Sequence, residues 1–203
     1  MKRLIIIGAS AMGREACAYA HDCGYEVRGY LDSRKEILTE YSGYPPIVGS
    51  VEEYVPSEDD VFVCAIGDPG KKKAYCEIVS ARGGNFVSIV HPKAYVAANA
   101  RIGTGCIVCP NSTITADVRI GSHVIVNVNS SVNHDSSLGD YTTVSPGCNI
   151  AGWCTIGSCV FMGVNSACIP HVRLGDDVFV AASALVISDV ASGRVMGIPA
   201  KIK

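Results

Sequence analysis

A six-residue repeat runs through the C-terminal half of this chain and restricts its fold more than any other feature. Every sixth residue from position 90 to position 186 is apolar. The set is Val90, Val96, Ile102, Val108, Ile114, Ile120, Val126, Val132, Leu138, Val144, Ile150, Ile156, Met162, Cys168, Leu174, Val180 and Val186. A helix requires a period near 3.6 and an ordinary strand a period of two, so neither fits a strict six. The repeat predicts a β-solenoid.

Two further periods define the shape of this solenoid. A set of small residues, from Ala94 to Ala184, lies four positions after each apolar residue, and Ile-Gly or Leu-Gly pairs recur every eighteen residues from Ile102 to Leu174. Three hexads therefore make one triangular coil, with the large residue inside and the small residue near a corner. We expect about five and a half coils stacked roughly 4.8 Å apart. No insertion interrupts the hexads, so no long loop is expected over a face.

The ten cysteines are predicted to be reduced thiols in small apolar positions rather than a disulfide framework. Cys106, Cys148 and Cys154 belong to the small set, and Cys168 is an inward residue. Cys106 and Cys109 form a CxxC pair, but no second CxxC or His pair follows to complete a zinc site. We therefore expect no metal.

Before the repeat, the pattern changes to alternating strands and helices. The expected strands are 4–7, 27–31, 61–66 and 86–89, and the expected helices are 13–23 and 71–82. Such alternation favours a small α/β unit with a parallel sheet. The predicted fold is thus an α/β, Rossmann-like N-terminal domain over residues 1–87, followed by an all-β, hexapeptide-repeat parallel β-helix over residues 88–203.

A glycine turn in the N-terminal domain indicates a phosphate site. The first strand leads into a turn from Gly8 to Gly13 and then a helix, whose first backbone N–H groups can face a phosphate. Ser10 replaces the middle glycine of the dinucleotide motif, and about 85 residues are too few for the complete dinucleotide fold. A half-sized fold that binds a mononucleotide, such as the UDP of a nucleotide sugar, fits better. The alternative is a turn that only lets the helix pack. Asp32 ends the second strand, and Gly67 lies in a second turn at the same sheet edge.

Charge and hydropathy exclude two classes of partner. The formal net charge is −2 with scattered charges, which provides no basic face for nucleic acid. The apolar run at positions 4–7 is too short for a signal peptide or a membrane span. A cytoplasmic protein without membrane contact is expected.

Among the histidines of the β-helix, one stands beside a carboxylate. His134 precedes Asp135, and a neutral imidazole next to a carboxylate can remove a proton from an amine or hydroxyl. The dipeptide alone leaves a surface role open. The other histidines are expected to be structural or solvated at His21 and His91, and exposed on the β-helix at His123 and His171.

Motifs along nearly the whole chain carry a family resemblance. They are the turn from Gly8 to Gly13 with Arg14, Tyr30-Leu31-Asp32, Ala65-Ile66-Gly67-Asp68, Ile89-Val90-His91-Pro92, Asn133-His134-Asp135, Leu138-Gly139-Asp140-Tyr141, Ser145-Pro146-Gly147, Ala151-Gly152 and Gly197-Ile198-Pro199-Ala200-Lys201. The chain resembles the nucleotide-sugar and sialic acid acetyltransferase family of hexapeptide-repeat proteins. Members N-acetylate UDP-4-amino-sugars or GDP-perosamine, and relatives O-acetylate sialic acid. The resemblance implies a left-handed β-helix, acetyl-CoA as co-substrate, and a homotrimer with active sites between subunits.

The resemblance also implies roles for particular residues. His134 is the expected general base and Asp135 its acidic partner. The nucleotide-sugar contacts implied are Gly8, Ser10, Ala11, Met12, Gly13, Asp32, Gly67 and Asn127, with Asp32 near the uracil and ribose. The acetyl-CoA contacts implied are Thr143, Gly152, Ala182, Gly197, Pro199 and Lys201, with the Gly152 N–H at the thioester. The chain departs from many relatives at two positions, because Met12 and Thr143 stand where they carry histidines.

Acetyl transfer to a nucleotide-linked amino-sugar, directly from acetyl-CoA to an amine deprotonated by His134, is the predicted function. Three alternative functions remain open. They are an O-acetyltransferase of sialic acid or another sugar, a nucleotide-sugar-binding β-helix without catalysis, and a zinc hydratase of the γ-carbonic anhydrase kind. The last requires three His ligands on one metal, whereas His134 and His171 are two coils apart and His123 lies on another face.

Overall fold

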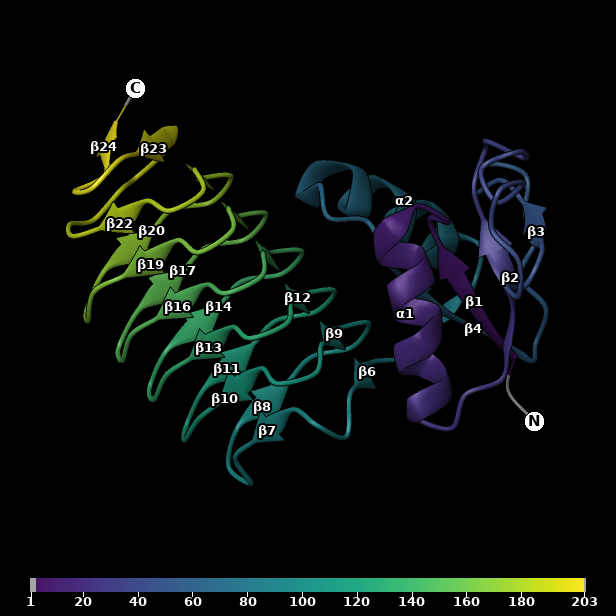
Figure 1. Ribbon diagram of the computed structural model, residues 1–203, viewed down its shortest axis with the longest axis horizontal. Helices are drawn as coiled ribbons and strands as arrows, with labels where there is room; N and C mark the ends of the chain where they lie inside the picture. Colours follow the sequence, from purple (N-terminus) through teal and green to yellow (C-terminus); the bar gives the residue numbers. More distant parts are fainter. Residues whose placement is uncertain (1–2, 203) are drawn as a thin grey trace.

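A computed structural model describes residues 3–202 and contains two parts, a small α/β unit and a long β-solenoid (Figure 1). The α/β unit has a parallel sheet in the order β3-β2-β1-β4-β5. Its elements are β1 (Arg3–Ile7), α1 (Ala11–Asp22), β2 (Val27–Leu31), β3 (Ile47–Gly49), β4 (Asp60–Cys64), α2 (Pro69–Ala81) and β5 (Asn85–Phe86). Within residues 3–202, no helix has the length and hydropathy to cross a bilayer.

The helices begin earlier than the sequence analysis predicted, and β3 is additional. At α2, Asp68 is the N-cap and its Oδ1 accepts a hydrogen bond from the Lys71 N–H at 2.8 Å. Pro69 then occupies the first helical position, where its missing N–H costs nothing. At α1, Ser10 is the N-cap and makes no side-chain capping bond. The first turn of α1 therefore keeps N–H groups that a ligand can reach.

Three parallel sheets form the solenoid, as the hexad repeat predicted. The β6 sheet contains β6 (Ile89–Val90), β9 (Ile107–Val108), β12 (Ile125–Val126), β15 (Thr143–Val144), β18 (Phe161–Met162), β21 (Phe179–Val180), β23 (Arg194–Met196) and the antiparallel β24 (Lys201–Ile202). The β7 sheet contains β7 (Tyr95–Val96), β10 (Thr113–Ile114), β13 (Ser131–Val132), β16 (Asn149–Ile150), β19 (Ala167–Cys168) and β22 (Leu185–Val186). The β8 sheet contains β8 (Arg101–Ile102), β11 (Arg119–Ile120), β14 (Ser137–Leu138), β17 (Thr155–Ile156) and β20 (Arg173–Leu174). Partners among the hexad strands are eighteen residues apart, as in Ser131 and Asn149, and only the pairs of β23 and β24 differ among the described residues of these sheets. The predicted fold class is confirmed.

Burial explains the two residue classes of each hexad. The second residue of each two-residue strand points inward, and Val132 and Val144 are fully buried in one continuous core. Hydroxyls in the small set satisfy backbone groups of the next coil. Ser136 Oγ donates to the Ala151 carbonyl at 2.8 Å and accepts from the Cys154 N–H at 2.9 Å. Small residues there thus fill the corner and bond successive coils together.

The triangular section has three edges, each made by the turns between two sheets. The Asn127 edge joins the β6 and β7 sheets, and the His134 edge joins the β7 and β8 sheets. The third edge, between the β8 and β6 sheets, contains the eighteen-residue glycine repeat. A Cβ at Gly139 would lie 2.5 Å from the Ser158 backbone nitrogen, so only glycine lets adjacent coils approach there.

The α/β unit packs against the first coils of the β6 sheet (Figure 1). The outward side chains of Ile89, Ile107 and Ile125 are buried in the same core as the apolar residues of α1. Cys109 belongs to this core and Cys106 to the solenoid interior, so the two CxxC thiols lie in different cores.

The prediction that His123 is exposed was wrong. Its side chain lies in the domain contact, where Phe86 meets it edge-on at 4.6 Å and Tyr141 stacks on it at 5.0 Å. His91 is structural, because its Nε2 lies 2.9 Å from the Asp22 carboxylate. The hexad repeat cannot reveal that the N-terminal domain covers the His123 position.

Lys72 of α2 is the most unusual residue of this contact. It is fully buried, and its ammonium donates to the Thr142 carbonyl at 3.2 Å and to Thr143 Oγ1 at 2.7 Å. Burial lowers the pKa of Lys72 to about 8. No carboxylate within residues 3–202 forms a salt bridge with it. The charged form is therefore tolerated at a cost in stability.

This burial predicts an unusual pH dependence of stability. Between pH 8 and the ordinary lysine value of 10.5, the unfolded chain holds the Lys72 proton and the folded chain does not, so stability rises with pH. Relative to Lys72→Met, the wild-type free energy of unfolding should increase by about 2 to 3 kcal/mol from pH 7 to pH 10. Urea denaturation at both pH values measures this difference. Lys73→Met, at an exposed position of the same helix, is the control and should keep the pH dependence of the wild type. The prediction would be contradicted if the free energy of unfolding of Lys72→Met changed with pH as much as that of Lys73→Met.

Candidate active site

The two glycine turns of the α/β unit meet at one cavity of about 390 Å³. Gly8 and Ser10 of the first turn and Gly67 of the second line it, as the sequence analysis predicted for one sheet edge. Two cationic side chains, Arg34 and Lys71, lie on its wall. Asp32 and Glu52 also line the cavity, and Asp32 pairs with Arg34. The helix N–H groups and Lys71 are the groups that suit an anionic phosphate.

Close packing requires glycine in the first turn. Gly8 has φ of 92°, and a Cβ at Gly13 would overlap the Gly8 carbonyl. The glycines thus allow α1 to approach the end of β1 closely. A Cβ at Gly67 would meet nothing within 4 Å, so packing does not require that glycine.

Asp32 is already occupied by its own chain. Its oxygens accept from the Ala9 N–H at 3.0 Å and from the Arg34 guanidinium at 2.9 and 2.8 Å. Burial alone raises the pKa of Asp32, but the hydrogen bonds from Arg34 and Ala9 outweigh it and hold the pKa below its ordinary value. The group presented to solvent is Arg34, whose side chain is 63% exposed. The predicted contact from Asp32 to a ribose remains a prediction.

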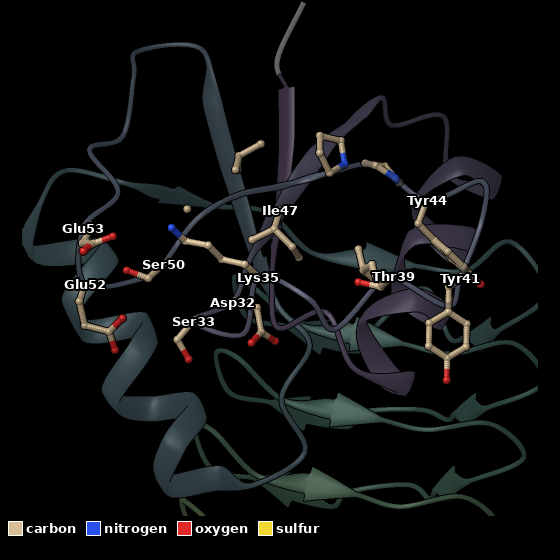
Figure 2. Close-up of a pocket in the computed structure, with 15 residues that line it drawn as sticks. Asp32, Ser33, Lys35, Thr39, Tyr41, Tyr44, Ile47, Ser50, Glu52 and Glu53 are labelled. Atoms are coloured by element: carbon tan, nitrogen blue, oxygen red, sulfur yellow. The ribbon is translucent and has the colours of Figure 1, made fainter.

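A larger cavity of about 940 Å³ lies beside the first and is lined by the segment from Asp32 to Glu53 (Figure 2). Its polar walls include Lys35, Tyr41 and Glu52. The Arg14 guanidinium lies 3.7 Å from the Tyr41 ring centroid and so attaches this segment to α1. These residues were not predicted from the sequence, because the segment has no periodic pattern. Its closely spaced aromatic and proline residues were the available signal.

His134 lies on the edge of the solenoid in an arrangement suited to a base. Its Nδ1 is 3.0 Å from Asp135 Oδ2. Because an ionised carboxylate only accepts, this contact places a proton on Nδ1 and leaves the Nε2 lone pair free. Within residues 3–202, Nε2 has no hydrogen-bond partner, and the side chain is 48% exposed. The predicted pair is therefore in contact.

Gly152 supports the His134 ring from the next coil. A Cβ there would lie 2.5 Å from Cε1 and 2.7 Å from Nε2 of His134, so the ring packs directly against the glycine backbone. Among the described residues, no acceptor takes the Gly152 N–H. A free backbone donor thus lies beside the candidate base.

The other predicted site residues are on the Asn127 edge or near it. Asn127 Nδ2 lies 3.9 Å from the Met12 sulfur, which joins this edge to the first turn of α1. Ala182 lies on the same edge, and the C-terminal turn is on the next coil, where the Gly197 carbonyl accepts from the Leu185 N–H and Pro199 and Lys201 follow. Thr143 is buried and accepts from Lys72, so it faces the domain contact.

The structure does not bring all predicted site residues together within one chain. His134 and Gly152 lie on one edge, whereas Asn127, Met12 and Ala182 lie on or beside another. The β7 sheet separates the two edges. Each hexad spans on the order of 15 to 20 Å at about 3.3 Å per residue. One subunit alone does not assemble the complete set.

Potential metal ligands are dispersed. Over residues 3–202, no three His, Cys, Asp or Glu side chains lie close enough to hold a metal ion. His134 and His171 share an edge, but the Trp153 ring lies between them. The described residues of one chain therefore do not assemble the donor set of a zinc hydratase.

A nucleotide-type turn on a small α/β unit, followed by a β-helix with a His–Asp pair on its edge, defines a class of sugar acyltransferases. Residues 3–79 match the family model of the PglD N-terminal domain. The chain therefore carries a PglD-type N-terminal domain on a left-handed, hexapeptide-repeat β-helix. The resemblance inferred from the sequence is confirmed.

Named relatives agree with this class. The UDP-N-acetylbacillosamine N-acetyltransferase of Bacillus subtilis is 29% identical over 68 residues, which are 34% of this chain and only 31% of that relative. The acetyltransferase domain of PglB from Neisseria gonorrhoeae superimposes with a TM-score of 0.92 at 26% identity, covering 100% of both chains. PerB from Caulobacter crescentus, solved in complex with CoA and GDP-perosamine, gives a TM-score of 0.92 at 29% identity and covers 100% of this chain and 98% of PerB.

Proposed function

We propose that this protein transfers the acetyl group of acetyl-CoA to the amine of a nucleotide-linked amino-sugar, with a UDP-4-amino-sugar as the expected acceptor. The observation that carries the proposal is the His134 imidazole, with Asp135 on Nδ1, a free Nε2, and the Gly152 N–H beside it. The relatives support the donor, because the PglB domain has also been solved with acetyl coenzyme A. The phosphate-suited cavity of the α/β unit supports a nucleotide-linked acceptor.

The proposed reaction is a direct transfer. The acceptor amine attacks the thioester carbonyl, a C–N bond forms, and His134 Nε2 takes the amine proton. The Gly152 N–H stabilises the oxyanion, and Asp135 stabilises the imidazolium. When the C–S bond breaks, the proton passes from His134 to the departing thiolate, which leaves as CoA.

Two edges that are apart in one chain meet if three chains pack around their β7 sheets. The outward residues of this sheet are uncharged: Tyr95, Thr113, Ser131, Asn149, Ala167 and Leu185. The β8 sheet instead presents Arg101, Arg119 and Arg173, and the β6 sheet is partly covered by the α/β unit. A homotrimer with the β7 sheets innermost sets the His134 edge of one subunit against the Asn127 edge of the next, which completes the site.

Residues 1–87 are proposed to hold the nucleotide and residues 88–203 to provide the base and the acetyl-CoA site. The ten cysteines are all free, which suits a reducing compartment, and we place the enzyme in the cytoplasm.

A thiol-release assay with acetyl-CoA tests the function. The acceptors are UDP- and GDP-linked amino-sugars, the same sugars without the amine, and sialic acid. Release that requires the amine supports N-acetylation. Release with hydroxyl acceptors alone indicates the O-acetyltransferase, and no release with any acceptor, despite nucleotide-sugar binding, indicates the non-catalytic alternative.

Gly152→Ala is expected to lower kcat about 10- to 100-fold, because the new Cβ displaces the His134 ring and misplaced catalytic groups lose rate steeply. Steady-state kinetics on the folded variant measures the loss. Gly70→Ala is the control, since its Cβ would meet only Asp68 Oδ1 at 3.5 Å, and it should keep its rate. A normal kcat in Gly152→Ala would remove the support role of this glycine.

A further inference from the structure

Trp153, the only tryptophan of the chain, occupies a position that suits it poorly. It lies in the turn of the His134 edge with φ of 57°, a left-handed conformation that bulky residues rarely adopt. Its side chain is also 51% exposed in the single chain, so burial within the chain does not compensate for the strain. Equivalent turn positions elsewhere hold residues that tolerate this conformation, such as Asn111, Asn129 and Asn165.

At Tyr141, side-chain packing compensates for the same left-handed backbone conformation. Its φ is 60°, but its ring stacks on His123 and packs against the core below α2. Trp153 has no comparable burial, and its aromatic partners within residues 3–202 are His134 and His171. Backbone strain kept without a gain in packing is typical of a functional position.

The contacts of Trp153 lead directly to the proposed base. Its ring centroid lies 4.4 Å from that of His134, with the rings at 88°. On the coil after it, His171 stacks on the indole at 5.1 Å and 7°. His134 belongs to the coil before, so the indole lies between the two imidazoles. Asp135, Gly152 and Trp153 together confine the His134 ring and leave Nε2 accessible.

We propose that Trp153 is a positioning residue that holds the His134 imidazole perpendicular to its indole, so that Nε2 faces the acceptor amine in the subunit cleft. This inference rests on the proposed function. His171 stacks on the same indole from the next coil and, among the described residues, makes no hydrogen bond or ring contact with His134.

Trp153→Asn is the decisive variant, because asparagine fits the left-handed turn and removes the ring. We expect an unchanged or higher Tm, a kcat about tenfold or more below wild type, and KM values for acetyl-CoA and acceptor within about threefold. Trp153→Phe should recover most of the rate. In the His134→Ala background, Trp153→Asn should change the residual rate little, since the indole acts through the imidazole.

Other outcomes overturn the inference. A normal kcat in Trp153→Asn, the same tenfold loss in the His134→Ala background, or a loss expressed only in KM removes the positioning role. A lower Tm that accounts for the lost activity assigns Trp153 to structure instead. The contact is tested without turnover by the emission of this single tryptophan, which should change in His134→Ala and should not change in His21→Ala. If the wild type releases no thiol with any acceptor, the proposed function is wrong. If the wild type is active and Trp153→Asn is fully active as well, only this inference is wrong.

Discussion

His134→Ala is expected to lower kcat by about 10² to 10⁴, the range lost when a general base is removed. The side chain is half exposed and its ring makes no core contact, so the variant should keep its trimer and its Tm. Steady-state thiol release, size-exclusion chromatography and thermal unfolding measure the three properties.

The matched control for this variant is His171→Ala on the same edge. That imidazole is two coils away and does not contact Asp135, so kcat should stay within about threefold of wild type. Near-normal turnover in His134→Ala would eliminate His134 as the base. Equal losses in both variants would indicate a general effect on the edge instead.

A charge on the β7 sheet is expected to abolish activity by separating the subunits. Ala167→Arg places a guanidinium on the uncharged face that we assign to the trimer core, where a buried unpaired charge is very unfavourable. Thr155→Arg makes the same change on the exposed β8 sheet and is the control. Light scattering should give a monomer for the first and a trimer for the second. A trimeric, active Ala167→Arg would assign the interface to another face.

Complementation tests whether each active site is shared. His134→Ala lacks the base, and Ser10→Glu places a carboxylate at the expected phosphate site, so each alone should be inactive. After the two are unfolded together at equal amounts and refolded, about a quarter of the sites combine an intact base with an intact neighbouring nucleotide site. Recovery to about a quarter of wild-type activity supports the shared site. Activity that stays at the level of the separate variants would place the whole site within one chain.

The solenoid could be predicted in detail because its period determines which residues point inward. Val132 and Val144 were identified as core residues from spacing alone, and both are fully buried. Helix starts were predicted less well, since the Asp68 cap and Pro69 are local signals outside the apolar pattern. The extra strand β3 and its cavity segment were missed, because a short strand within an irregular segment has no period.

The candidate site was only partly predictable. His134 and Asp135 are adjacent in the sequence, and the structure brings their side chains into contact. Adjacency alone does not ensure this, because Asp22 follows His21 but pairs with His91. The engagement of Asp32 by Arg34 was not foreseen, although only two residues separate them, because it depends on how the segment after β2 turns back.

By itself, the sequence determined the parallel β-helix and the order of the two parts, because a six-residue period permits one set of inward residues. Only the tertiary structure decided which outward residues matter. It buried His123 of the solenoid and Lys72 of α2 in the contact between the two parts, placed Trp153 against His134, and put His134 and Asn127 on different edges. Outward positions are equivalent in the repeat, so their roles depend on what packs on each face and edge.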